Sequence, residues 1–171
     1  MKTNALSVAN YFIELAHKEG KPIHLLGLVK RVYIAHGFAL ALLHRGLLDP
    51  RFDKVEAWKY GPVIPSVYHS FKQYRKDEIT APTIMLHQES DGDYNFIEPH
   101  IEIEDDKKIV KMVWDRYRNY TDSQLITLTH RKGTPWGVCF KEGENCEIPD
   151  SYTELYYKKL VKIIVENGRR S

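Results

Sequence analysis

Residues 24–45, HLLGLVKRVYIAHGFALALLHR, decide the fold. Within them, residues 32–43 are apolar on nearly every side of a helix, and His36 and Gly37 interrupt the pattern. A helix that is apolar all round is a buried helix, so this segment is predicted to be the centre of the domain. Gly46 follows it and is the expected C-terminal cap.

Further helices are expected around this central one, because apolar residues recur at intervals of three and four along much of the chain. The last of these helices is predicted to end at Asn167, and residues 131–149 are expected to be rich in loops. The predicted helices begin near residues 4, 65, 105, 122 and 150.

Residues 79–103 carry a different pattern. Strand-like stretches lie on both sides of the turn cluster Ser90-Asp91-Gly92-Asp93, which predicts a β-hairpin. The expected fold class is therefore mainly α: a compact helical domain around a buried central helix, with a small β-hairpin insertion. A single domain should cover residues 1–168, and residues 169–171 should form a frayed tail.

The composition is that of an ordinary globular protein, with 43% hydrophobic and 28% charged residues in a chain of 171. The net charge of +2 is too small to indicate nucleic-acid binding by itself. Two cysteines do not make a disulfide scaffold, and the first residues lack the apolar core of a secretion signal. We find no apolar stretch long enough to span a bilayer, so a cytoplasmic protein with no membrane partner is expected.

Signatures of catalysis are missing from the sequence. It contains no nucleophile elbow, phosphate-binding loop, dinucleotide fingerprint or zinc-protease motif. The eight histidines form no helical i, i+4 pair, and Cys139 and Cys146 have no further cysteine nearby. We therefore expect no catalytic residues, no metal and no cofactor. An enzyme would require His36, His69 or His130 to lie beside a carboxylate in a cleft.

Residues 56–71, EAWKYGPVIPSVYHSF, combine four aromatic side chains with one glycine and two prolines. They predict a short extended segment that enters a turn at Gly61-Pro62, with Pro65 in the first turn of the following helix. Rigid aromatic side chains lose little entropy on binding and often supply the hot spots of interfaces. The same residues could equally pin the loop to the core.

Three parts of the chain carry a resemblance. Residues 28–37, LVKRVYIAHG, are similar to the pattern LxKLLYYAxGW, and residues 56–68 match EAWxYGPVxPxVY almost completely. Leu128-Thr129-His130, followed by Pro135-Trp136, is similar to the pattern LTH…PW. In these motifs and in their order the chain resembles the Panacea-domain family, described as SocA-like antitoxins and phage-associated proteins.

The resemblance implies an antitoxin that binds and neutralises a cognate toxin protein. It would do so by direct occlusion, or as a proteolytic adaptor that delivers the toxin to an ATP-dependent protease, and the family is not known for catalysis. The family-motif and candidate partner-binding residues are Trp58, Lys59, Tyr60, Gly61, Pro62, Val63, Pro65, Tyr68, Lys30, Tyr33, His36, His130, Pro135 and Trp136.

Two alternatives stand beside this interpretation. The first is a nucleic-acid-binding regulator that represses its own promoter, with the basic pairs Lys30-Arg31, Arg131-Lys132 and Arg169-Arg170 in contact with phosphates. Without a recognisable nucleic-acid-binding motif, we rank nucleic acid below a protein as the primary partner. An uncharacterised enzyme ranks last.

Overall fold

The computed structural model describes residues 1–170, and it confirms a mainly α fold with a small β-hairpin insertion. Seven α-helices are present in the described residues, together with one short 3-10 turn, η1, at Lys72–Tyr74. The α-helices are α1 (Ala5–Lys18), α2 (Leu25–Leu43), α3 (Pro65–Phe71), α4 (Glu104–Tyr117), α5 (Asp122–Thr129), α6 (Pro135–Cys139) and α7 (Asp150–Arg170).

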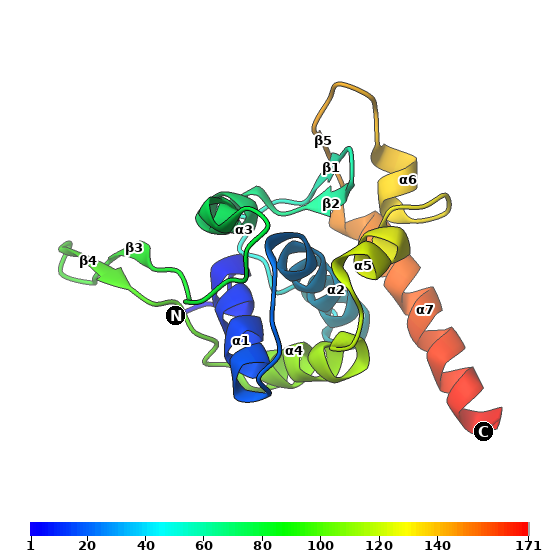
Figure 1. The fold of residues 1–171 in the computed structure, drawn as a ribbon, viewed down its shortest axis with the longest axis horizontal. Coiled ribbons are helices and arrows are strands. Elements are labelled where there is room, and N and C mark those ends of the chain that lie inside the picture. Colours follow the sequence, from blue (N-terminus) through cyan, green and yellow to red (C-terminus); the bar gives the residue numbers. More distant parts are fainter. Residues whose placement is uncertain (171) are drawn as a thin grey trace.

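Helix α2 is the centre of the fold, as predicted. It contacts α1, α4, α5 and α7, and these helices surround it in Figure 1. Every residue from 27 to 40 is buried. Its length and its mean hydropathy of 1.5 would also suit a membrane span, which the sequence prediction overlooked. Within the domain, however, 83% of this apolar stretch is buried, as expected for a core helix.

The end of α2 differs from the prediction. His44, with φ 56°, is the left-handed C-cap in place of Gly46. Gly46 instead lies against the ring of His36. The approach is so close that a Cβ at position 46 would be 2.2 Å from His36 Cε1. The backbone N–H of Leu47 then donates to His36 Nδ1 at 3.1 Å. Gly46 is therefore needed for a close approach of the chain to α2 rather than for a cap.

A three-stranded antiparallel sheet lies beside the helices, with strand order β2-β1-β5. Its strands are β1 (Glu56–Trp58), β2 (Gly61–Val63) and β5 (Cys146–Glu147). The predicted turn at Gly61-Pro62 is wrong by two residues, because Trp58 pairs with Gly61 and the turn is Lys59-Tyr60. Strand β5 was not predicted, since two residues show no periodicity.

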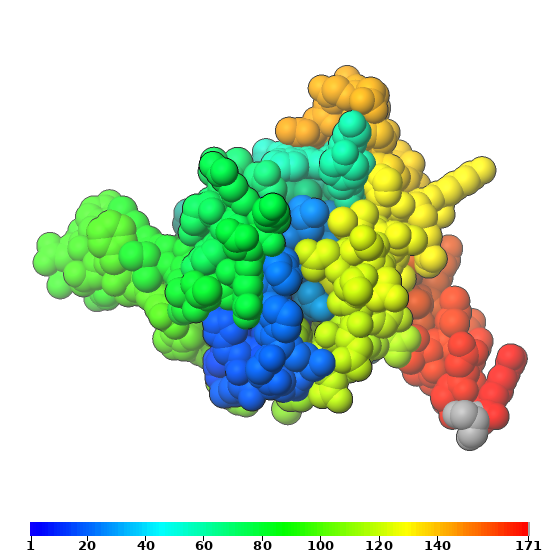
Figure 2. Space-filling view, in the orientation of Figure 1, coloured from blue at the N-terminus to red at the C-terminus, as the bar shows by residue number. Residues whose placement is uncertain are grey.

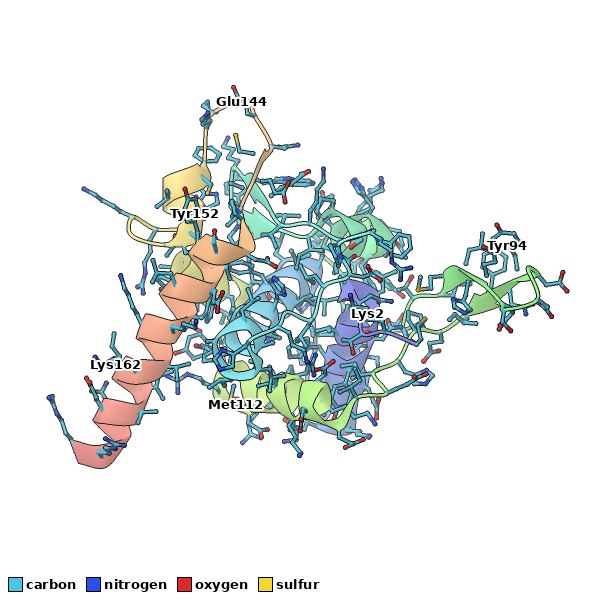
Figure 3. The ribbon with its side chains drawn as sticks, turned by 180° about the vertical axis from the view of Figure 1, so that it is seen from behind. Lys2, Tyr94, Met112, Glu144, Tyr152 and Lys162 are labelled. Carbon is cyan, nitrogen blue, oxygen red and sulfur yellow. The ribbon has the colours of Figure 1, made fainter. Side chains whose placement is uncertain are left out.

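The predicted hairpin is confirmed as β3 (Met85–Gln88) paired with β4 (Tyr94–Ile97). It projects from the body of the domain, and Figure 3 shows Tyr94 on this projection, far from the helices. The side chains of Leu86, Tyr94 and Phe96 are more than half exposed.

Helix α7 packs on α2 with its first half, where Tyr157 is buried, and its second half extends away from the body (Figure 1). The predicted end at Asn167 is wrong. The helix continues to Arg170, so Arg169 and Arg170 are helical. Ser171 lies outside the described residues. Residues 131–149, expected to be loop, also contain α6, which begins at Pro135.

Candidate partner-binding surface

Two parts of the chain that are far apart in the sequence, residues 56–71 and residues 130–140, bring their aromatic side chains to one face. The β1–β2 hairpin supplies Trp58 and Tyr60, and α3 follows it directly in the chain. The ring of Trp58 packs edge-on against that of Tyr68, with centroids 5.0 Å apart. The end of α5 and helix α6 add a second group, in which the rings of His130 and Trp136 are 4.0 Å apart. We define the aromatic surface as Trp58, Tyr60, Tyr68, His69, His130, Trp136 and Phe140.

Hydrogen bonds hold the two indole rings of this surface in place. Trp136 Nε1 donates to the backbone oxygen of Trp58 at 2.6 Å, which ties α6 to the hairpin. Trp58 Nε1 donates to Glu56 Oε2 at 2.8 Å, and Glu56 also pairs with Lys54 at 3.2 Å. Both indoles are half-buried: their polar edges are satisfied within the protein, and parts of their rings are open to solvent.

Lys30 connects the β1–β2 hairpin to the core helix α2. Its side chain is buried, and Nζ donates to the backbone oxygen of Pro62 at 2.8 Å. Burial lowers the pKa of Lys30 to about 7. This lysine links the core helix α2 to β2 and is not available to a partner.

Gly61 allows the hairpin to lie close to the helices. Its φ of 112° is a conformation that other residues rarely adopt. A Cβ at this position would be 3.1 Å from Lys30 Nζ and 3.3 Å from His130 Cβ. The glycine therefore combines an unusual backbone angle with a contact to both α2 and the end of α5.

Replacing Gly61 by alanine should lower the free energy of unfolding by about 1 kcal/mol or slightly more, because the backbone would be strained and Lys30 would have to move. Urea unfolding of the variant and the wild type measures this. Gly92→Ala is the matched control for backbone strain alone, since Gly92 has φ 95° and open space around it. Equal losses at the two positions would contradict a role for the close approach at Gly61.

A family model described as Antitoxin SocA-like, Panacea domain, matches residues 28–137. The chain belongs to this family. It is also 31% identical over 145 residues to Antitoxin SocA of Caulobacter vibrioides (strain NA1000 / CB15N), a match that covers 79% of this chain and 69% of that protein. No solved structure matches the chain. The residues matched by the Panacea model include the whole aromatic surface except Phe140.

The structure separates the predicted Panacea motif residues into two groups. Lys59 and Tyr60 are exposed, and the half-buried members are Trp58, Pro65, Tyr68, His130 and Trp136. The buried members are Lys30, Tyr33, His36, Gly61, Pro62, Val63 and Pro135. The first group can contact a partner, whereas the second holds the surface or the core together. As partner-binding residues, the sequence prediction missed His69, which follows Tyr68 directly, and Phe140, which stands at helical spacing from Trp136.

Tyr33 and His36 face α7 rather than the aromatic surface. The hydroxyl of Tyr33 lies 3.3 Å from that of Thr153, and burial raises the pKa of Tyr33. His36 Nε2 lies 2.8 Å from Asp150 Oδ1, and this hydrogen bond lowers the pKa of Asp150. These two motif residues therefore join α2 to the start of α7.

The histidines do not form the cluster that the enzyme alternative requires. His36 has a carboxylate beside it, but its ring is buried and both of its nitrogens are occupied by Asp150 and Leu47. His69 and His130 have no carboxylate partner among the described residues. Within residues 1–170 no group of three or more His, Cys, Asp or Glu is arranged to hold a metal ion.

The nucleic-acid alternative loses one of its basic pairs. Lys30 and Arg31 were expected to touch phosphates, yet both side chains are buried. Arg31 Nη2 donates to the backbone oxygens of Tyr117 and Tyr120, each at 3.2 Å. The prediction for this pair is wrong because backbone carbonyls inside the fold take the place of an external anion.

Proposed function

We propose that this protein is an antitoxin that neutralises a cognate toxin protein by direct contact through the aromatic surface. Membership of the SocA-like family supports the class of function, and the name of the Caulobacter relative agrees with it. The observation that carries the proposal is the aromatic surface itself: motif side chains from two distant parts of the chain meet there and remain partly open to solvent.

The aromatic surface has the physical properties of a preformed binding site. Its indoles are fixed by hydrogen bonds to the backbone oxygen of Trp58 and to Glu56, so little side-chain entropy remains to be lost on binding. Tyrosine and tryptophan are enriched among the residues that dominate interface energies. A stable interface buries about 800 Å² on each partner, and a toxin covered over such an area would have its active surface occluded.

Tyr60 gives the sharpest test, because its side chain is 60% exposed at the tip of the hairpin and its removal should leave the fold intact. We expect Tyr60→Ala to weaken binding to the toxin at least about tenfold. The toxin candidate is the product of the open reading frame beside this gene. Growth rescue on co-expression and the Kd of the purified pair are the measurements.

Tyr94→Ala is the matched control, since this tyrosine is 61% exposed but lies on the β3–β4 hairpin. It should bind the toxin like the wild type. If Tyr94→Ala weakens binding and Tyr60→Ala does not, the contact lies on the projecting hairpin and the proposed surface is wrong. Rescue of growth without a stable complex, together with a shortened toxin half-life, would favour a proteolytic adaptor over occlusion.

A further inference from the structure

A pocket of about 950 Å³ lies between the start of α2, the turn η1 and the connection from α4 to α5. Figure 2 shows the face concerned, where the green segment around η1 and the yellow-green segment after α4 stand on either side of the blue start of α2. The pocket is lined by six basic side chains and by one carboxylate, that of Asp122. We call this the basic pocket; its cations are Lys21, Arg31, Lys72, Arg75, Lys76 and Arg118.

Among residues 1–170, Arg118 is the one cation of the basic pocket that forms an ion pair; Lys21 instead donates to Asn119 Oδ1, and Arg31 to backbone oxygens. Lys72, Arg75 and Lys76 form no ion pair with any residue from 1 to 170. Arg118 differs, because it lies 3.3 Å from Glu19 and 3.9 Å from Asp115. Like charges that gather in a concave site repel one another and raise the local potential for an anion. The basic pocket therefore holds more positive than negative side chains, with Asp122 as the carboxylate in its lining.

Arg31 lies at the base of the basic pocket and adds a second observation. Its side chain is 4% exposed, and its Nε atom has no hydrogen-bond partner among the described residues. Burial lowers the pKa of Arg31 to about 10, against the opposing effect of Asp122. A buried donor without a partner is uncommon in folded proteins and is costly to retain.

The basic pocket is continuous with the aromatic surface. Tyr68 lines the pocket and at the same time packs on Trp58, with ring centroids 5.0 Å apart. Tyr120 adds an exposed ring at the pocket. Aromatic residues and arginine are the residue types enriched in protein–protein interfaces, and a charged rim beside an aromatic centre is the usual arrangement. An extended phosphate backbone, by contrast, is bound by cations distributed along a longer path.

We infer that the basic pocket receives a segment rich in Asp and Glu from the same protein partner that covers the aromatic surface. This inference rests on the proposed function for the identity of the partner. The presence of the pocket itself does not depend on it. The acidic segment would neutralise Lys72, Arg75 and Lys76, while the aromatic surface contributes apolar contact area. Charges at such a rim mainly accelerate association and select the partner.

The test uses the full chain and a short fluorescein-labelled peptide rich in glutamate and leucine. The wild type should bind this peptide, and added salt should weaken the binding. In Lys72→Glu/Lys76→Glu the affinity should fall at least about tenfold. The matched control is Lys159→Glu/Lys162→Glu, which makes the same change of net charge at exposed positions of α7 outside the pocket. The control should bind the peptide within about twofold of the wild type, because the potential in the pocket depends mainly on the charges that line it.

Three results would overturn the inference. They are no binding of the peptide to the wild type, equal weakening in both variants, and preference for a single-stranded oligonucleotide of equal charge over the peptide. The last result would assign the pocket to nucleic acid. Thermal unfolding of both variants establishes that they are folded.

A second measurement separates this inference from the proposed function. If the neighbouring toxin binds the wild type and Tyr60→Ala weakens it, but Lys72→Glu/Lys76→Glu does not, the antitoxin proposal stands and the pocket inference fails. If no toxin binds the wild type, the proposed function fails, and the peptide assay still decides whether the pocket recognises acidic segments.

Discussion

Gly37→Ala is expected to destabilise the protein by about 2–3 kcal/mol, although alanine normally stabilises a helix relative to glycine by about 1 kcal/mol. The reason is the contact between α2 and α7. A Cβ on Gly37 would lie 2.3 Å from two ring carbons of Tyr157. That ring is buried and packs edge-on against Tyr33 and Phe38, so it cannot move aside. The substitution should therefore separate α7 from the core helix.

Urea unfolding of the wild type, Gly37→Ala, Tyr157→Ala and the double variant measures this effect as a cycle. In the Tyr157→Ala background the methyl group added at position 37 meets empty space, so Gly37→Ala should there be neutral or stabilising. A loss of stability that is the same in both backgrounds would show that the close approach of α2 and α7 is not the cause.

The second large effect is a pH dependence of the free energy of unfolding, and Lys30 is its source. Its pKa is lowered by burial from 10.5 to about 7. Between these two values the unfolded chain holds a proton that the folded chain has released, so the folded state gains stability as the pH rises. Where the unfolded lysine is fully protonated and the folded one fully deprotonated, the free energy of unfolding rises by about 1.4 kcal/mol per pH unit. From pH 7 to pH 9 the gain should be about 2 kcal/mol.

Lys30→Met removes the titrating group while keeping a long apolar side chain. We expect the wild type to gain about 2 kcal/mol relative to this variant between pH 7 and pH 9, measured by urea unfolding at several pH values. Lys159→Met, at an exposed position of α7, is the control and should follow the wild type at every pH. Parallel curves for the wild type and Lys30→Met would mean that Lys30 stays charged in the folded protein.

The arrangement of elements could be predicted because local patterns carry it. The all-round apolar character of residues 32–43 is satisfied by burial on every side, and it placed α2 correctly at the centre of the domain. The turn cluster Ser90-Asp91-Gly92-Asp93 likewise specified a hairpin. Short elements escaped prediction: β5 has two residues and α6 has five, too few for any periodicity.

The candidate site could be predicted only in part. Trp58, Tyr60 and Trp136 stood out as aromatic residues within motifs, and the structure leaves all three at least partly exposed. Lys30 and Arg31, however, look like surface residues in the sequence because they are charged. Their burial depends on backbone carbonyls from distant segments, and a sequence does not show which carbonyls will be near.

The sequence by itself determined that a buried helix lies at the centre, that other helices surround it, and that the motif aromatics include candidates for partner contact. These properties follow from the side-chain pattern along each segment. The tertiary structure alone decided that the hairpin, α3 and α6 share one face, and that six cations from separate segments line one pocket. Their proximity depends on how segments far apart in the chain pack together, because the energy of those contacts exists only after the core has formed.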